Sequence, residues 1–215
     1  MGLFNRVRKL KPLDGYNRWA SSYFTEANPI KTYSNEYIAK WLIDIKGKSV
    51  LDAGCGAGAL CLLAQKWGAS KVTGVDLSPA MIEEATKNCK DIDLQCVDLS
   101  KEKVSGKFDV IICALVLAHI PDAEAVLKNL IDNLTPGGMM LITDFHPIQT
   151  QKGAKRTFVD KATNKTFEVE HFFHDLEHYF SIIQSCGVSI EDLVESEWKG
   201  QPVVFGMKIR KHNTN

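Results

Sequence analysis

Short apolar runs alternate with helix-like patterns between residues 48 and 145. The runs near 48–52, 71–75, 93–97, 108–113 and 139–145 have the length and β-branched content of buried strands. Between them, apolar residues recur at helical spacing near 58–67, 79–87 and 122–134. Strands that alternate with helices in this way predict βαβ units and a parallel sheet.

The chain on either side of this block follows different patterns. Two segments before it, at 16–24 and 35–43, carry apolar faces at helical spacing and are predicted to cover one end of the sheet. After it, alternating residues at 156–159 and 165–169 flank a turn-like segment and predict a β-hairpin. We then expect a helix and two strands that pair with the sheet edge, near 174–185, 188–197 and 202–210.

These patterns together predict an α/β fold with a doubly wound, Rossmann-like sheet of seven strands. The sheet is expected to be mostly parallel, with an antiparallel strand at its C-terminal edge. A chain of 215 residues suffices for one sizeable core, so we expect a single domain. Its parts would be an N-terminal helical cap (1–46), a cofactor-binding core (47–146), a hairpin insert (147–173) and a C-terminal helix with strands (174–215).

Composition narrows the range of partners. The 26 basic and 26 acidic residues balance, and no long basic run interrupts the predicted fold, so nucleic acid is not expected as a main partner. Neither a signal peptide nor an apolar run long enough to span a bilayer is evident, which favours a cytoplasmic protein without stable membrane insertion. The six cysteines form no Cys-x-x-Cys pair and are interpreted as reduced thiols.

The first eleven residues are basic and amphipathic. As a helix they would place Leu3, Phe4, Val7 and Leu10 on one face, with the basic residues off it. Weak peripheral contact with a membrane surface is one interpretation of this pattern. A loosely docked N-terminal arm is the other, and the short length of the segment favours it.

The stretch most informative about function is a predicted strand that ends at Asp52 and is followed by three closely spaced glycines. Gly54, Gly56 and Gly58 permit positive φ and let a ligand approach main-chain N–H groups. The spacing of Gly54, Gly56 and Ala59 also fits a dinucleotide loop, so the glycines alone do not separate the two kinds of ligand. The carboxylate of Asp52 suits a cationic ligand better than a pyrophosphate.

A second apolar strand ends in Asp76. An acid at this strand tip accepts hydrogen bonds from ribose hydroxyls, so the loop and Asp76 together predict a ribose-bearing ligand without phosphates. Helix capping is the alternative role for Asp76, although Ser78 before Pro79 fits a helix N-terminus better.

Several stretches match a known family in order. They are 16–23 (YNRWASSY), 50–58 (VLDAGCGAG), 74–81 (GVDLSPAM), 96–99 (CVDL), 108–114 (FDVIICA) and 134–138 (LTPGG). Through these stretches the chain resembles class I S-adenosylmethionine-dependent methyltransferases, in the small-molecule subgroup that includes ubiquinone and menaquinone C-methyltransferases. The resemblance fades after Pro147.

The resemblance implies S-adenosyl-L-methionine as cofactor, S-adenosyl-L-homocysteine as product and a small-molecule methyl acceptor. It implies that Gly54, Gly56 and Gly58 shape the methionine and ribose site and that Asp76 binds the ribose. Further cofactor contacts implied in the same way are Leu77 and Met81 along the adenine, Asp98 and Leu99 at its amino group, and Ala114 beside the methionine.

The residues themselves leave alternatives for some of these positions. Core packing is the alternative for Met81, and a solvated loop carboxylate is the alternative for Asp98. Tyr16, Trp19 and Tyr23 recur at helical spacing, which is typical of core packing. In the resembled family this helix closes over the cofactor, which implies that Tyr16 contacts cofactor or acceptor and makes Tyr23 a substrate-site candidate.

Methyl transfer requires a base only where the nucleophile keeps its proton, and histidine is the usual base near neutral pH. His146, after the strand at 139–145, is the first candidate for catalysis or substrate contact, and His119 is the second. A structural histidine bonded to backbone is the alternative for both. His171 and His174 are secondary substrate-site candidates.

The spacing of His174 and His178 places two imidazoles on one helical face, as a metal site requires. The segment is not His-Glu-x-x-His and no further ligand is evident, so no metal is expected.

The predicted function is therefore methyl transfer to a small-molecule acceptor. One rival is a nicotinamide-dependent oxidoreductase on the same sheet, against which stand Asp52 and the lack of a Tyr-x-x-x-Lys motif. The other rival is a non-catalytic S-adenosylmethionine-binding protein. The absence of an Asn-Pro-Pro-Tyr motif after the fourth strand argues against methylation of adenine or of a glutamine amide.

Overall fold

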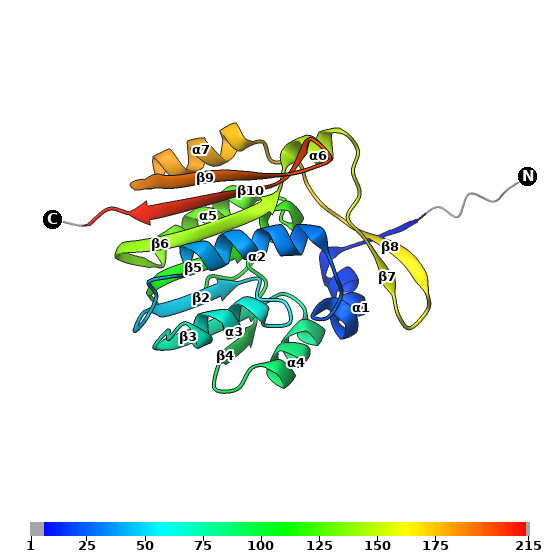
Figure 1. Cartoon of the computed structure of the whole chain (residues 1–215), viewed down its shortest axis with the longest axis horizontal. Coiled ribbons are helices and arrows are strands. Elements are labelled where there is room, and N and C mark those ends of the chain that lie inside the picture. The colour runs from blue at the N-terminus through cyan, green and yellow to red at the C-terminus, as the bar shows by residue number, and fades with distance from the viewer. Residues whose placement is uncertain (1–6, 214–215) are drawn as a thin grey trace, which may run out of the picture.

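The larger of two β-sheets forms the centre of the protein in the computed structural model, which describes residues 7–213 (Figure 1). Its seven strands lie in the order β4-β3-β2-β5-β6-β10-β9. The strands from β4 to β6 are parallel, and β10 is antiparallel to both β6 and β9. Their bounds are β2 (Ser49–Ala53), β3 (Lys71–Asp76), β4 (Asp93–Cys96), β5 (Phe108–Ala114), β6 (Leu134–Phe145), β9 (Val188–Trp198) and β10 (Gln201–Lys211). The predicted α/β fold is confirmed.

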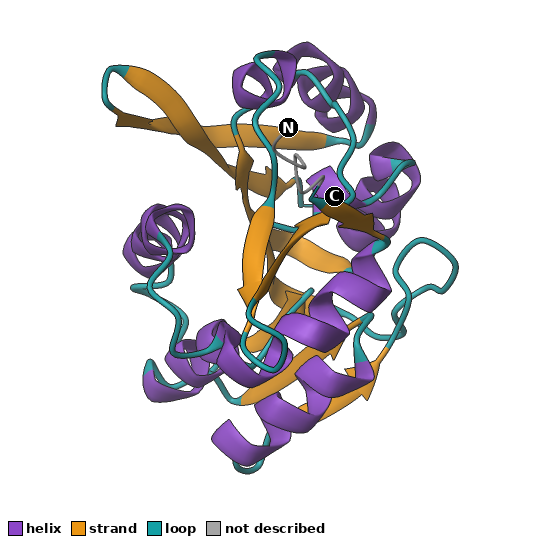
Figure 2. Cartoon of the chain, turned by 90° about the vertical axis from the view of Figure 1, so that its right-hand side faces the viewer, coloured by secondary structure: helices purple, strands orange, loops and turns teal. Residues whose placement is uncertain are grey.

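Helices cover both faces of this sheet because its strands bury side chains on both sides (Figure 2). Leu51 and Ala53 of β2 pack in one cluster with α5 and α7, while Val50 packs in the other cluster with α2 and α3. The helices are α1 (Pro12–Tyr23), α2 (Pro29–Trp41), α3 (Ala59–Lys66), α4 (Pro79–Asn88), α5 (Ala123–Asp132), α6 (Pro147–Gln151) and α7 (Leu176–Ser185), with a 3-10 turn η1 (Leu117–His119).

The first two helices begin earlier than the apolar pattern predicts. They start at Pro12 and Pro29, not near residues 16 and 35, and in each the proline occupies the first turn, where its missing N–H costs nothing. The Asn28 side chain accepts the N–H groups of Ile30 and Lys31 and so caps α2. Apolar periodicity reports only the buried face, so it missed these polar first turns.

The predicted hairpin is confirmed as β7 (Thr157–Asp160) and β8 (Lys165–Val169), and it belongs to a second, three-stranded sheet. The third strand is β1 (Arg8–Leu10), which runs parallel to β8. The helical expectation for this part of the N-terminus is therefore wrong, because residues 8–10 are extended and pair with the hairpin. Leu3 and Phe4 lie outside the described residues.

The small sheet packs with α1 around a cluster of its own. Leu10 is only 5% exposed and shares this cluster with Trp19 of α1 and with Phe158 and Phe167 of the hairpin. The rings of Trp19 and Phe158 stack at 4.9 Å between centroids. In this way β1 and the hairpin pack on α1, which also contacts α4.

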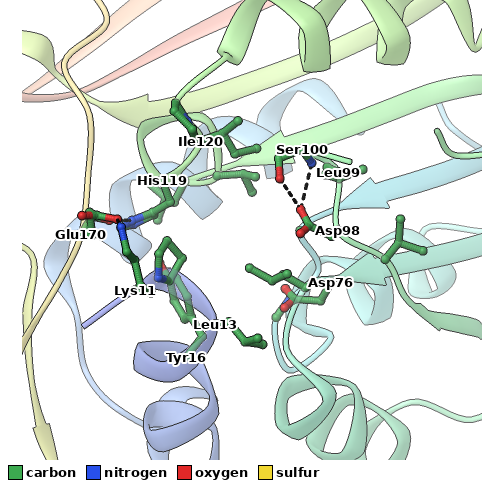
Figure 3. A pocket seen from close by; sticks show the side chains of 18 of the residues that line it. Lys11, Leu13, Tyr16, Asp76, Asp98, Leu99, Ser100, His119, Ile120 and Glu170 are labelled. Carbon is green, nitrogen blue, oxygen red and sulfur yellow. Dashed lines mark hydrogen bonds and ion pairs between the residues drawn. The ribbon is translucent and has the colours of Figure 1, made fainter. Parts of the chain in front are cut away.

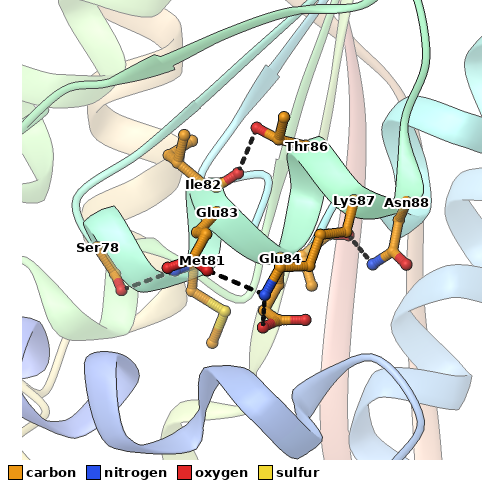
Figure 4. A network of polar contacts seen from close by, with 9 residues as sticks. Ser78, Met81, Ile82, Glu83, Glu84, Thr86, Lys87 and Asn88 are labelled. Carbon is orange, nitrogen blue, oxygen red and sulfur yellow. Dashed lines mark hydrogen bonds and ion pairs between the residues drawn. The ribbon is translucent and has the colours of Figure 1, made fainter.

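Polar contacts along α4 fix the helix next to the glycine loop (Figure 4). Ser78 caps its N-terminus by accepting the N–H of Met81 at 3.1 Å, and Lys87 pairs with Glu83 and Glu84 on the exposed face. At the other end, the Asn88 amide donates to the Ala57 carbonyl at 3.1 Å. The last residue of α4 therefore holds the loop that follows β2.

Candidate active site

A cavity of about 320 Å³ lies at the carboxyl edge of the main sheet, where α1 faces the strand ends. Figure 3 shows Asp76 and Asp98 on one wall and Tyr16, His119 and Glu170 on the other. We call these the sheet wall and the opposite wall. The sheet wall is formed by Gly54, Gly56, Asp76, Leu77, Val97, Asp98, Leu99 and Ala114, and the opposite wall by Lys11, Leu13, Tyr16, Tyr23, His119, Ile120, Glu170 and Phe172.

The glycine loop adopts the positive φ angles that its composition suggests: 85° at Gly54, 52° at Gly56 and 88° at Gly58. A Cβ at Gly54 would lie 2.2 Å from a methyl group of Val116, so only glycine fits here without displacing its neighbour. Gly54 and Gly56 line the cavity. Gly58 lies behind them, against Cys89.

Asp76 faces the cavity with both carboxylate oxygens held by backbone donors. Oδ2 accepts the Gly56 N–H at 2.8 Å and Oδ1 accepts the Ser78 N–H at 2.9 Å. Each oxygen keeps a further acceptor site for a ligand. Burial raises the pKa of this carboxyl, and the two backbone donors oppose that rise. Since Ser78 caps α4, the capping alternative for Asp76 does not apply.

Asp52 lies behind the loop and is only 1% exposed. Its Oδ2 accepts a hydrogen bond from the Cys61 thiol at 3.3 Å, whereas Oδ1 has no partner among the described residues. Burial raises its pKa to about 7. A buried carboxylate oxygen without a partner is costly, which indicates that a donor or cation belongs next to it.

Asp98 lines the cavity, but its carboxylate already has partners. Oδ1 accepts the N–H of Ser100 at 3.0 Å, and Oδ2 pairs with Lys101 at 2.7 Å. Leu99 is 8% exposed beside it and, like Leu77 and Val97, gives this end of the cavity an apolar surface. A flat, largely apolar ligand group would fit here.

Tyr16 and Tyr23 are both part of a packed aromatic cluster and part of the cavity lining. Burial raises the pKa of each phenol, so both remain protonated. Core packing is therefore observed for both side chains, and their place in the cavity lining leaves ligand contact as a prediction.

His119 is the histidine that the structure brings to the cavity. Its Nδ1 lies 2.7 Å from the Glu170 carbonyl, which can only accept, so the proton belongs on Nδ1 and Nε2 keeps a free lone pair. The ring meets Tyr16 edge to face at 5.4 Å. Burial lowers the pKa of His119 to about 4, so the imidazole is neutral at pH 7.

The other predicted histidines lie outside the cavity lining. His146 caps α6 through Nδ1, which accepts the Ile148 N–H, and its Nε2 contacts Glu195 at 2.8 Å. His174 contacts the Ile120 carbonyl at 2.8 Å, and His171 contacts the Val169 carbonyl at 3.3 Å. All of these contacts are with backbone groups except that of His146 Nε2, which is with the Glu195 carboxylate.

Met81 is also outside the cavity lining. It is fully buried and packs with Trp19 and Ala20 of α1, which matches the core-packing alternative. Within the described part of the chain, no three His, Cys, Asp or Glu side chains are grouped so as to hold a metal ion, and no helix is long and apolar enough to cross a membrane.

Sequence reasoning missed much of the opposite wall. Lys11 and Glu170 form an ion pair at 2.7 Å across it, and Leu13 and Phe172 add apolar surface. Leu115 also lines the cavity, and its φ of 60° is unusual for a branched side chain. No sequence pattern predicts this backbone conformation. Lys11, Leu13, Glu170 and Phe172 come from segments next to strands of the second sheet, whereas Leu115 directly follows β5 of the main sheet.

The fold and site together define a Rossmann-like protein with a cavity at the carboxyl ends of its strands. A family described as "Methyltransferase domain" matches residues 44–199. The chain belongs to this family, as the sequence resemblance predicts.

Named relatives agree with that assignment. A ubiquinone biosynthesis O-methyltransferase of Coxiella burnetii is 33% identical over 160 residues, covering 70% of this chain and 66% of the relative. An enzyme of the same name from another strain of Coxiella burnetii is 37% identical over 121 residues, covering 54% of this chain and 50% of the relative. The chain thus spans between half and two-thirds of these relatives' lengths.

Solved structures share the fold. The N-methyltransferase NodS from Bradyrhizobium japonicum, in complex with S-adenosyl-L-homocysteine, has a TM-score of 0.72 at 17% identity, covering 94% of this chain and 99% of that one. At this level of identity the likeness concerns the fold alone.

Proposed function

We propose that this protein binds S-adenosylmethionine in the cavity and transfers its methyl group to a small-molecule acceptor. The observation that carries the proposal is the pair of strand-tip carboxylates around the glycine loop. Asp76 presents spare acceptor sites to the cavity, and Asp52 keeps an oxygen directly behind the loop that has no partner among the described residues. A ligand with ribose hydroxyls would satisfy Asp76, and its positive charge would favour the ionised form of Asp52.

The sheet wall offers a place for each part of this ligand. Asp76 would accept the ribose hydroxyls, and Leu77, Val97 and Leu99 would cover an adenine ring. The open backbone at Gly54 and Gly56 would lie against the methionine part, where the charge of Asp52 favours the cationic groups. When bound, S-adenosylmethionine supplies a methyl group already activated by its sulfonium.

The chain's own contribution is mainly alignment and shielding from water. Tyr16 and Tyr23 supply aromatic faces that suit a sulfonium through cation–π attraction. His119 would accept a hydrogen bond from the acceptor at Nε2 while its Nδ1–H stays on the Glu170 carbonyl. This contact would orient the nucleophile toward the sheet wall.

The relatives support methyl transfer as the reaction type. Those with 33% and 37% identity are named ubiquinone biosynthesis O-methyltransferase. Two solved structures of the same fold contain S-adenosylmethionine or S-adenosylhomocysteine. We also propose a cytoplasmic location, supported by six cysteines that are all free in the structure.

Calorimetric titration of the protein tests the cofactor assignment. We expect S-adenosylmethionine and S-adenosylhomocysteine to bind with micromolar dissociation constants, because ligands of this size with a few charged contacts reach that range. Asp76→Ala should weaken both at least tenfold by removing the ribose acceptor.

The control variant is Asp93→Ala, on the exposed edge strand β4 outside the cavity lining, which should bind like the wild type. NAD and NADP serve as control ligands. If a nicotinamide nucleotide binds and S-adenosylhomocysteine does not, the proposed function is wrong and a nicotinamide-dependent oxidoreductase takes its place.

A further inference from the structure

Asp144 is a buried carboxylate next to the end of β6, and the proposed function gives it no task so far. The residue is 1% exposed, and both of its oxygens accept backbone N–H groups. Oδ1 accepts the N–H of Phe145 at 2.7 Å, and Oδ2 accepts the N–H of Ala118 at 2.8 Å. Burying a carboxylate costs free energy unless donors compensate it. One of these donors comes from the η1 turn, which precedes Asp144 in the chain and follows a different strand.

Ala118 lies in the η1 turn, directly before His119. Its N–H is held by the Asp144 carboxylate, and its carbonyl accepts the Phe172 N–H at 2.7 Å. Both backbone polar groups of Ala118 are therefore bound to distant segments, one at the end of β6 and the other after β8. The backbone that carries the His119 ring is fixed from two sides.

The ring of His119 depends on this placement. Its Nδ1 lies 2.7 Å from the Glu170 carbonyl, and its ring meets Tyr16 edge to face at 5.4 Å. Figure 3 shows the three residues together on the opposite wall. Because hydrogen bonds weaken steeply with distance and angle, a shift of the η1 turn would break the contact with Glu170. It would also move Nε2, the atom to which we assign the methyl acceptor.

The segment that leads into η1 also contacts the glycine loop. The Leu115 N–H donates to the Thr143 carbonyl at 2.7 Å, and Leu115 has a φ of 60°. Val116 lies so close to Gly54 that a Cβ there would be 2.2 Å from one of its methyl groups. A few consecutive residues therefore touch the proposed cofactor loop and carry the proposed acceptor contact, so the placement of this segment sets the distance between the two.

Asp144 suits this role as a group that only accepts hydrogen bonds. Burial raises its pKa to about 6, while the backbone donors and the charge of Arg156 oppose the rise, so the carboxyl is mostly ionised at pH 7. An ionised carboxylate matches two N–H donors. An asparagine would still offer one acceptor oxygen to the Ala118 N–H, whereas an alanine would offer none.

We propose that Asp144 is a positioning residue for methyl transfer, which holds the η1 turn so that Nε2 of His119 faces the methyl acceptor. Asp144 lies outside the cavity lining and acts through Ala118. This inference rests on the proposed function, which gives Nε2 its task, and adds what fixes that atom at the cavity. A misplacement of about 1 Å in such a contact can lower a rate by about a hundredfold.

Imidazole NMR on the protein without ligand tests this role. In wild-type protein with isotope-labelled histidine, the His119 signal is identified by its absence from His119→Asn. It should show one tautomer, with the proton on Nδ1 and Nε2 unprotonated. Asp144→Ala removes both acceptor oxygens, so His119 should lose this signature and populate both tautomers. Asp144→Asn keeps an acceptor for the Ala118 N–H and should retain the wild-type signature.

Thr143→Val is the matched control at the neighbouring position of β6. Thr143 is as buried as Asp144, but its side chain contacts the Ser34 hydroxyl of α2 at 2.6 Å and not the η1 turn. This variant should lose stability in a thermal melt followed by circular dichroism and still keep the wild-type His119 signature. Asp144→Leu, which keeps the branched shape without an acceptor, takes the place of Asp144→Ala if the alanine variant does not fold.

Several results would overturn the inference. They are two populated tautomers in the wild type, a single tautomer that persists in Asp144→Ala, loss of the signature in Asp144→Asn, and its loss in Thr143→Val. Failure of both Asp144→Ala and Asp144→Leu to fold would assign Asp144 to the fold itself and also overturn it. The tautomer comparison needs no ligand, whereas the titration with S-adenosylhomocysteine tests the proposed function. Failure of one is therefore distinguishable from failure of the other.

Discussion

Single residues at this site are defined by what their neighbours leave free. Nδ1 of His119 contacts a carbonyl, and Nε2 is available to a ligand. Each carboxylate oxygen of Asp76 accepts one backbone N–H and can accept a further hydrogen bond. Among the described residues, Asp52 and Arg156 each keep one buried polar atom without a partner, although neither lines the cavity. The positions that Asp76 and His119 leave free are the ones open to a ligand.

The buried imidazole makes stability depend on pH. The pKa of His119 is about 4 in the folded protein against 6.5 for the free side chain, so between these values the unfolded chain binds more protons. Stability should therefore fall as the pH falls through this window, by about 3 kcal/mol from this residue. We expect His119→Asn to lose this part of the dependence.

Urea unfolding of wild type and variant at pH 7.0 and pH 4.5 measures the effect. The free energy of unfolding of the wild type relative to His119→Asn should drop by about 2 kcal/mol at the lower pH. Burial raises the pKa values of Asp52 and Asp144 to about 7 and 6, so these carboxyls make the folded state more stable as the pH falls. Both proteins contain them, so comparing wild type and variant at the same pH removes their contribution. An identical difference at both pH values would refute the prediction.

Among the elements, β1 and the hairpin support the opposite wall of the site. Together they form a sheet separate from the main one, and their side chains form a cluster with α1, which forms part of the opposite wall. The small sheet therefore keeps Tyr16 and His119 in place through packing rather than through direct contact with a ligand.

Leu10→Ala tests this role of the second sheet. Removing a 5% exposed leucine from a small aromatic cluster should destabilise it by about 2–4 kcal/mol. Hydrogen exchange should become faster at the amides of β7 and β8, because the loss is local to their cluster. Leu193→Ala, at a leucine 46% exposed on β9, is the control and should leave those amides unchanged. Exchange that speeds up equally in both sheets would show that the cluster is no separate unit.

At the scale of the whole molecule, the cavity lies where two structural units meet. The main sheet supplies one wall, and α1, η1 and the segment after β8 supply the other. A ligand that touches both walls should therefore tie the units together.

Binding of S-adenosylhomocysteine should be visible far from the residues that hold it. At 100 times its dissociation constant it should stabilise the protein by about 2.7 kcal/mol and slow hydrogen exchange in α1 and β1 as well as at the strand ends. Asp76→Ala at the same ligand concentration is the comparison and should show much smaller protection. Protection confined to the main sheet would mean that the opposite wall does not respond to the ligand.

The sequence determined the main sheet, the hairpin and the sheet wall of the cavity. The strands near 48–52, 71–75 and 108–113 are predictable because their side chains are buried on both faces of the sheet. Such continuous apolar runs can be recognised without knowing which strands lie beside them. Gly54, Gly56 and Asp76 follow the strand ends directly in the chain, so topology alone brings them together.

Only the tertiary structure decided the opposite wall and the state of its side chains. Whether His119 or His146 reaches the cavity depends on the groups that each ring contacts. His119 contacts the Glu170 carbonyl, whereas His146 contacts the Ile148 N–H and the Glu195 carboxylate. Arg156 likewise resembles any hairpin arginine in the sequence, and only its burial and the lack of an acceptor for Nε among the described residues distinguish it. Local patterns report which face of an element is buried, whereas burial without a partner arises only when distant segments pack around one atom.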